Sequence, residues 1–373
     1  MASSTSSSEP ATAPPEAPDT IIERAFAREV PALAWSRAAA FAFALTFLGL
    51  VGWELYARSL HLHAGDFDDG PGLWAAERRK VDTGPREQVV LLGDSRILYD
   101  TDLGIWEEVA GRRPIQLALR GTSGAAFLTD IANDEHFAGL AVVGMTEPLF
   151  FSGRMGLHGK SLEYLRTESP SQRSGQVLHV GISRVFAFLD EGYALFPMIE
   201  QIDIPNRGDI KGPYLDVWKI AETTDDRQTH LWERIETDAR LRDHAIRVWD
   251  DGKGPPLTAE QIAKTIDAAK RDCAKIRARG GEVVFLRPPS GQPNRANEEL
   301  RAPRAKVWDA LLRETGSRGI HFEDYPAMQG LEVPEHSHLS RASAKVFSRA
   351  YVEEIAKQIP WLESHRPAAV GER

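Results

Sequence analysis

The sequence predicts an α/β fold in three layers, with a central parallel sheet between helices, preceded by one transmembrane helix. Short apolar runs that end at glycine or polar residues alternate along the chain with helical stretches. The helical stretches carry apolar residues at three- and four-residue spacing, and such alternation is typical of α/β proteins. A long uncharged apolar segment near the N-terminus precedes all of these elements.

The composition is that of a globular protein and excludes some functions. The chain has 373 residues, of which 42% are hydrophobic and 27% are charged. Its net charge of −9 argues against sequence-independent nucleic-acid binding, which depends on clustered Lys and Arg. Cys273 is the one cysteine and has no partner for an internal disulfide, so we expect a structural role for it. We expect neither a metal nor a cofactor, since one cysteine cannot supply a zinc-type Cys/His spacing.

The N-terminal part predicts a tail and a membrane anchor. Residues 1–34 are predicted to be a disordered cytoplasmic tail, because Ser, Pro, Ala, Thr and acidic residues dominate their first part. Residues 35–57 contain an uncharged run with tryptophan and tyrosine at its ends, which predicts a membrane-spanning helix with interfacial anchors. A buried core helix and a cleaved signal peptide are the alternatives. More arginines precede this segment than follow it, so we expect the rest of the chain on the periplasmic side of the inner membrane.

The remaining chain divides into a stalk, a folded domain and a tail. Residues 58–87 are predicted to be a stalk that contains a short helix around 74–77, residues 88–360 the domain and residues 361–373 a tail. The predicted strands are 89–92, 115–118, 140–144, 283–286 and 320–322. The predicted helices are 101–111, 124–132, 258–279, 296–314 and 340–358. The alternation fails between 152 and 254, which we interpret as an insertion over the edge of the sheet, with a helix at 225–249.

A serine follows the first predicted strand directly. Gly93, Asp94 and Ser95 form a short turn there, and the carboxyl ends of parallel strands are the edge where open α/β sheets bind ligands. The turn would therefore present Ser95 at that edge. An ordinary strand-ending turn is the alternative interpretation.

A histidine near the C-terminus has the surroundings of a general base. Glu335 precedes His338 by three residues, and Ser340 is suited to cap the helix that follows. A carboxylate at this spacing can accept a hydrogen bond from one ring nitrogen and leave the other to take a proton from a serine. For an isolated histidine, capping or packing is the simpler interpretation, so the histidine and the serine must be considered together.

Together these residues resemble the SGNH, or GDSL-like, hydrolase superfamily, whose members have a flavodoxin-like three-layer domain. In that family a Gly-Asp-Ser motif ends the first strand and an Asp-x-x-His element closes the domain; here Glu335 stands in place of the aspartate. The resemblance implies that Ser95 is the nucleophile, His338 the general base and Glu335 the carboxylate that orients it. Gly121, after the second strand, matches the family's oxyanion-hole glycine, whose N–H would act with that of Ser95.

The fourth family element departs from the pattern. The family has an asparagine after the third strand, whereas this chain has Met145, Thr146 and Glu147 there. The Thr146 hydroxyl would supply the third oxyanion donor. A residue of the insertion, or an oxyanion hole with two donors, remains as an alternative.

Three arginines lie at predicted strand ends or beside the motifs. They are Arg96, Arg120 and Arg287. We interpret them as candidate substrate-binding residues, because arginine binds carboxylates and phosphates in a bidentate manner. Surface ion pairs are the alternative.

The layout is similar to membrane-anchored SGNH proteins of polymer acylation systems, such as alginate O-acetylation proteins and the D-alanyl transfer protein of teichoic acid synthesis. This resemblance implies O-acetyl transfer to an exported cell-envelope polysaccharide through an acyl-Ser95 intermediate. It also implies a multi-pass membrane O-acyltransferase as partner. A carbohydrate O-acetyl esterase and a catalytically silent scaffold of an envelope assembly are the alternative functions.

Overall fold

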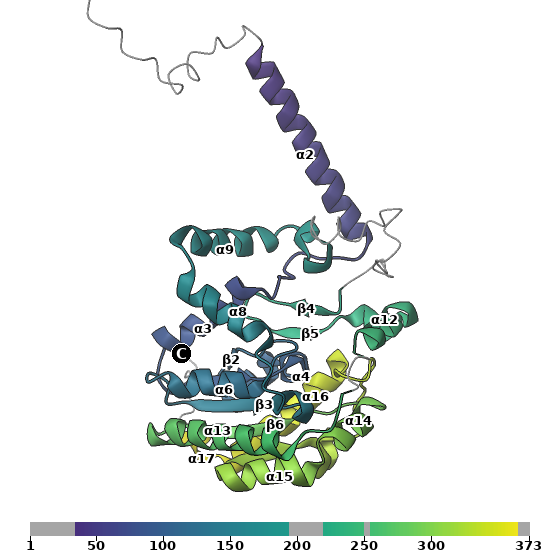
Figure 1. The fold of residues 1–373 in the computed structure, drawn as a ribbon. Coiled ribbons are helices and arrows are strands. Elements are labelled where there is room, and N and C mark those ends of the chain that lie inside the picture. The colour runs from purple at the N-terminus through teal and green to yellow at the C-terminus, as the bar shows by residue number, and fades with distance from the viewer. Residues whose placement is uncertain (1–33, 194–218, 250–253, 365–373) are drawn as a thin grey trace, which may run out of the picture. The chain divides into compact units, whose positions relative to one another are not determined.

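The computed structural model describes residues 34–193, 219–249 and 254–364, and the chain separates into two compact units, 1–52 and 53–373 (Figure 1). Helix α2 (Trp35–Ser59) begins in the first unit and ends in the second. It is long and apolar enough to span a membrane, and none of its most apolar window is buried. The predicted cytoplasmic tail lies outside the described residues, except for Ala34.

A five-stranded parallel sheet forms the centre of the second unit, which confirms the predicted α/β class. Its strand order is β2-β1-β3-β6-β7. The strands are β1 (Val89–Leu92), β2 (Ile115–Gln116), β3 (Leu140–Gly144), β6 (Glu282–Arg287) and β7 (Arg318–His321). β1 and β3 are buried at every position, as expected for strands covered on both faces.

Helices cover the sheet, and the apolar residues of β1 alternate between two hydrophobic clusters. Val90 and Leu92 pack with residues of α3, α6, α13 and α15, whereas Val89 and Leu91 pack with residues of α4, α5, α16 and α17. These helices are α3 (Pro71–Thr83), α4 (Ser95–Asp100), α5 (Leu103–Ala110), α6 (Gly124–Asn133), α13 (Ala259–Ala278), α15 (Arg304–Thr315), α16 (Arg341–Gln358) and α17 (Pro360–Ser364). The short elements near the sheet are α7 (Glu147–Phe150), α14 (Asn294–Arg301), η4 (Phe322–Asp324) and η5 (Pro326–Met328).

The predicted stalk is wrong, because residues 71–83 form helix α3 in the core of the unit. Trp74 is fully buried, and its indole N–H donates a hydrogen bond of 2.9 Å to the carbonyl oxygen of Leu117. The short helix predicted around residues 74–77 is a buried helix of 13 residues in the structure. The predicted tail also begins inside the fold, since Leu362 of α17 is buried; residues beyond 364 lie outside the described part.

Two predicted helices are divided in the structure. The segment 296–314 becomes α14 and α15, because Pro303 cannot continue a helix and instead precedes α15. The segment 225–249 contains part of a hairpin, β4 (Ala221–Thr223) and β5 (Thr229–Leu231), and then α11 (Glu233–Thr237) and α12 (Ala239–Trp249).

The buried Arg227, in the turn of the β4–β5 hairpin, connects this hairpin to strand β2 at the edge of the sheet. Arg227 forms a bidentate ion pair with Asp69 at 2.6 and 2.9 Å, and its guanidinium also donates to the carbonyl oxygens of Gln116 and Ala118, both at 2.7 Å. The other described elements between 152 and 254 are α8 (Gly156–Thr167), α9 (Pro170–Ser183), η1 (Ala187–Leu189) and η2 (Glu191–Tyr193).

Candidate active site

The turn after β1 holds Ser95 as the first residue of α4. Gly93 has a φ of 142°, and a Cβ added there would lie 2.5 Å from the carbonyl oxygen of Gly144, so only glycine fits. The Asp94 carboxylate caps the helix by accepting from the N–H of Arg96 at 3.0 Å, and it also accepts from the N–H of Thr146 at 3.0 Å. Asp94 therefore joins the ends of β1 and β3 and fixes the orientation of the serine.

Ser95, His338 and Glu335 form a hydrogen-bonded chain. The Nε2 atom of His338 lies 2.8 Å from the Ser95 Oγ, and its Nδ1 atom lies 2.7 Å from the Glu335 Oε1. With the Nδ1 proton on the carboxylate side, Nε2 is the acceptor for the serine hydroxyl. The histidine and the glutamate are fully buried, whereas the serine keeps 8% of its surface exposed. The structure thus brings together the three residues that the resemblance pairs.

The Glu335 carboxylate also closes the loop that carries the base. The backbone N–H of His338 donates to the same Oε1 atom at 2.6 Å, so one oxygen fixes both the ring and the main chain. His336, between them, has a φ of 70°, which lets the chain reverse within a short loop. The glutamate in place of the family aspartate is therefore compatible with an aligned imidazole.

Asp100 at the other end of α4 binds the same loop. Its Oδ1 atom accepts from the N–H of Leu339 at 2.8 Å, and burial raises the pKa of this carboxyl well above its ordinary value. The hydroxyl of Ser348 on α16 donates to the backbone carbonyl of Asp100 at 3.3 Å. A six-residue helix thus carries Ser95 at its start and holds the loop of His338 at its end.

A cavity of about 550 Å³ opens in front of the serine. Gly121 and Thr146 line it together with Ser95. Within the described residues, the N–H groups of Ser95 and Gly121 donate no hydrogen bond, and the Thr146 hydroxyl has no partner. The Thr146 N–H is occupied by Asp94, so its hydroxyl is the donor that remains.

The sequence interpretation missed the far wall of this cavity. Asn294 and Asn297 of α14 line it, with Arg301 from the same helix and Arg154 from the loop after α7. Asn294 donates to the carbonyl oxygen of His336 at 3.1 Å, whereas the Asn297 amide has no hydrogen-bond partner in the described part of the chain. The position of α14 after β6, at the carboxyl end of the sheet, was the signal that could have identified these residues.

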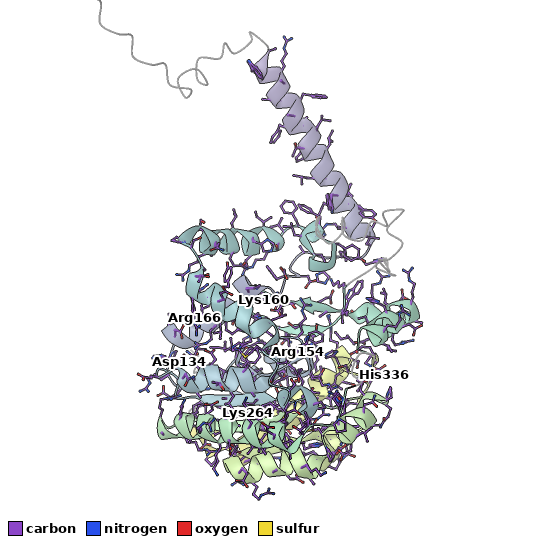
Figure 2. All side chains as sticks on the ribbon, in the orientation of Figure 1. Asp134, Arg154, Lys160, Arg166, Lys264 and His336 are labelled. Atoms are coloured by element: carbon purple, nitrogen blue, oxygen red, sulfur yellow. The ribbon has the colours of Figure 1, made fainter. Side chains whose placement is uncertain are left out.

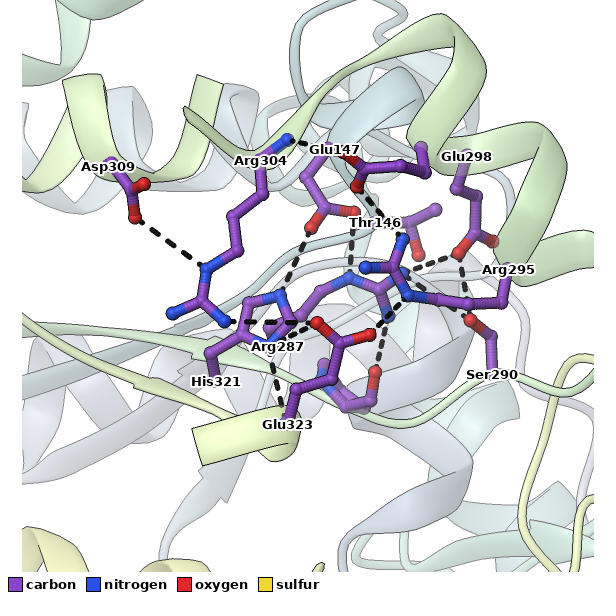
Figure 3. Close-up of polar contacts among 12 residues, drawn as sticks. Thr146, Glu147, Arg287, Ser290, Arg295, Glu298, Arg304, Asp309, His321 and Glu323 are labelled. Atoms are coloured by element: carbon purple, nitrogen blue, oxygen red, sulfur yellow. Dashed lines mark hydrogen bonds and ion pairs between the residues drawn. The ribbon is translucent and has the colours of Figure 1, made fainter. Parts of the chain in front are cut away.

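The three predicted arginines occupy different places. Arg96 lines the cavity and forms a buried ion pair with Glu298. Arg287 is fully buried behind it and binds Glu147 at 2.7 Å and Glu298 (Figure 3). Arg120 is half-buried and does not line the cavity.

The Glu298 carboxylate is shared by two arginines. Burial raises its pKa, but the charges of Arg96 and Arg287 outweigh this and lower the pKa to about 2. Ser290 adds a hydrogen bond of 2.8 Å to the same carboxylate. The network connects the cavity wall to the core, and the Nη1 atom of Arg96 has no hydrogen-bond partner among the described residues.

No family model matches the chain, and no curated protein matches it. The fold and the site define it as an α/β protein with a Ser–His–Glu chain at the carboxyl edge of a parallel sheet.

Proposed function

We propose that the chain is a membrane-anchored serine acyltransferase or esterase of the SGNH type, which acts through an acyl-Ser95 intermediate. The observation that carries the proposal is the continuous hydrogen-bonded chain from the Ser95 hydroxyl through His338 to the buried Glu335, at 2.8 and 2.7 Å. Such a chain raises the nucleophilicity of a serine hydroxyl, which is otherwise weak.

The SGNH assignment is supported by where the elements fall. The sheet order corresponds to that of flavodoxin-like folds when the five strands are numbered along the chain. The Ser95 turn follows β1, Gly121 follows β2 and Thr146 follows β3, while His338 precedes the last long helix, α16. This is the order of the family elements, with threonine where the family has asparagine.

The first half of the reaction forms the acyl-enzyme. The Ser95 Oγ attacks the acyl carbon of the donor ester while the His338 Nε2 takes the hydroxyl proton. The carbonyl oxygen becomes an oxyanion that the N–H groups of Ser95 and Gly121 and the Thr146 hydroxyl can bind. The imidazolium, paired with Glu335, then gives its proton to the departing alkoxide as the carbon–oxygen bond of the donor breaks.

The second half releases the acyl group. The His338 Nε2 takes a proton from the acceptor hydroxyl, whose oxygen attacks the acyl carbon, and the proton returns to Ser95 as its oxygen departs. We propose that the acceptor is a sugar hydroxyl of an exported polysaccharide and that the acyl group is acetyl. The amides of Asn294 and Asn297 on the cavity wall support this, because amide groups suit hydrogen bonds to sugar hydroxyls.

The alternative is a carbohydrate O-acetyl esterase on the same site. It is favoured by the width of the cavity, which gives water access to the partly exposed Ser95. The membrane anchor α2, a periplasmic active site and a multi-pass O-acyltransferase that delivers the acyl group complete the proposal. If Ser95 is not catalytic, the remaining hypothesis is that the chain is a catalytically silent scaffold of an envelope assembly.

The test uses the full chain in detergent with a chromogenic acetyl ester, beside Ser95→Ala and His338→Ala. We expect the ester to be cleaved by the parent and not by either variant. Adding a polysaccharide acceptor then separates the two activities: acetyl groups that appear on the polymer support transfer, and acetate release unchanged by the acceptor supports the esterase. Equal rates in parent and Ser95→Ala would refute both.

A further inference from the structure

Helix α9 exposes apolar side chains that the rest of its unit does not cover. Leu178 and Ile182 of this helix and Phe186 just after it are exposed by 63%, 37% and 39% of their surface. Val177 and Val185 beside them are exposed by 71% and 59%. We call these five residues the α9 patch. Leu178, Ile182 and Phe186 follow one another at four-residue spacing, which places the first two on one side of the helix.

The few contacts of α9 make this exposure unusual. Among the described residues of the helix, only Ser183 is buried. A helix of 14 residues is marginal alone in water, and amphipathic helices normally gain stability by burying their apolar side. The capping box of Ser169 and Gln172 stabilises its first turn but covers no apolar surface. The patch therefore needs a surface outside the described chain to cover it.

The patch is continuous with the C-terminal end of α2. The Glu54 carboxylate accepts the backbone N–H groups of Ala187 and Phe188, both at 3.2 Å, and the rings of Trp53 and Phe188 lie 6.2 Å apart. The N–H of Gly65 donates to the carbonyl oxygen of Ser183, the last residue of α9, at 2.8 Å. The C-terminal end of α9 is thus held beside the end of the apolar helix.

We propose that the α9 patch is a lipid-contacting surface that lies in the interface of the membrane that α2 crosses. Each helical residue rises about 1.5 Å, so Glu54, one position after Trp53, lies within a helical turn of the expected membrane boundary. Ala187 and Phe188, bound to Glu54, lie at the same depth. Apolar side chains of an interfacial helix enter the boundary between headgroups and acyl chains.

Apolar contact rather than charge carries this proposal. Arg173 and Arg184, at the two ends of the helix, are paired with Glu168 and Asp225 and offer little net positive charge to anionic headgroups. Figure 1 shows α9 beside α8, and Lys160 and Arg166 of α8, labelled in Figure 2, are exposed.

The experiment places an environment-sensitive fluorophore on the full chain in lipid nanodiscs. Leu178→Cys provides the labelling site, because Cys273 is fully buried. Leu300→Cys is the matched control: Leu300 is exposed by 72% and lies on α14, which packs against α7. We expect lipids that carry a quencher at the level of the upper acyl chain to remove most of the fluorescence at 178 and little at 300. Ile182→Cys should follow Leu178→Cys.

The proposal rests on the membrane anchor but not on the chemistry of Ser95, and the experiment separates the two. Protein that alkaline carbonate releases from vesicles would mean that α2 does not span the membrane. Firmly retained protein with equal quenching at 178 and 300 would refute the docking of α9 alone. A disulfide between two copies of Leu178→Cys, in place of quenching, would identify a second chain as the cover and would also refute it.

Discussion

We predict that the activity with the chromogenic ester depends on the negative charge of Glu335. Glu335→Gln keeps an oxygen that can accept from His338 but removes the negative charge that stabilises the imidazolium. The Nδ1–Oε1 distance is 2.7 Å, so the two charges in the transition state are about 4 Å apart. At an effective dielectric constant of about 20, such a pair contributes about 4 kcal/mol. Since about 1.4 kcal/mol is a tenfold change, we expect kcat for the chromogenic ester to fall by about 10³.

Glu332→Gln is the control for this measurement. Glu332 lies in the same loop and is exposed, and its carboxylate contacts no described residue, so kcat should stay near the parent value. Near-ultraviolet circular dichroism would check that both variants keep the parent fold. If Glu335→Gln retained more than about a tenth of the parent kcat, the argument that Glu335 supports the imidazolium by its charge would be refuted.

Three further predictions concern stability. Gly93→Ala places a Cβ 2.5 Å from the carbonyl oxygen of Gly144 at a φ of 142°. Urea unfolding should show a free energy of unfolding lowered by more than about 2 kcal/mol. Gly159→Ala is the control, because a Cβ at this helical position has no atom within 4 Å and should not lower the free energy of unfolding in this way. Glu298→Gln leaves the buried Arg96 without its carboxylate partner, while Arg287 keeps Glu147, and should lower the free energy of unfolding by about 3–5 kcal/mol at pH 7. Because the pKa of Glu298 is lowered to about 2, this loss should shrink as pH falls below the ordinary value of 4.5; a constant loss would contradict the pairing. The pKa of Asp100 is raised in the folded protein, so the parent protein loses stability as the pH rises above the ordinary value of 3.8. The free energy of unfolding of Asp100→Asn should therefore increase relative to that of the parent protein by up to about 1.4 kcal/mol per pH unit, until the pH reaches the folded pKa. Parallel pH profiles of the thermal midpoint would contradict this.

The sequence predicted the parts of the fold whose signals are local. β1, β3 and β6 are continuous apolar runs, which a strand covered on both faces requires, and the structure confirms them. A short helix was predicted around residues 74–77, but the length of α3 and its burial were missed, because its flanks are rich in Gly, Asp and Pro although Trp74 packs in the core. The β4–β5 hairpin was missed because Arg227, a charged residue, is held there by partners distant in sequence.

For the candidate site too, the sequence predicted the residues that lie in local motifs and missed those placed by the tertiary fold. Ser95 and His338 could be paired because each lies in a recognisable motif, and the structure places them 2.8 Å apart. Asn297 carries no motif, and its role as a cavity residue depends on where α14 begins. Arg287 ends its strand as expected, but its position behind the cavity depends on the burial of Glu147 and Glu298, which no local pattern reveals.

The distance along the chain between the nucleophile and its base also governs when the site can exist during synthesis. Ser95 and His338 are separated by 243 residues, and Asp100 must bind the Leu339 N–H for the loop to be placed. A chain that emerges from the N-terminus onward therefore carries an inert serine until its final segment has been made and packed. Under the proposed function, a product truncated before residue 335 would have α2 and all five strands of the sheet but neither Glu335 nor His338, so incomplete chains would cleave no esters.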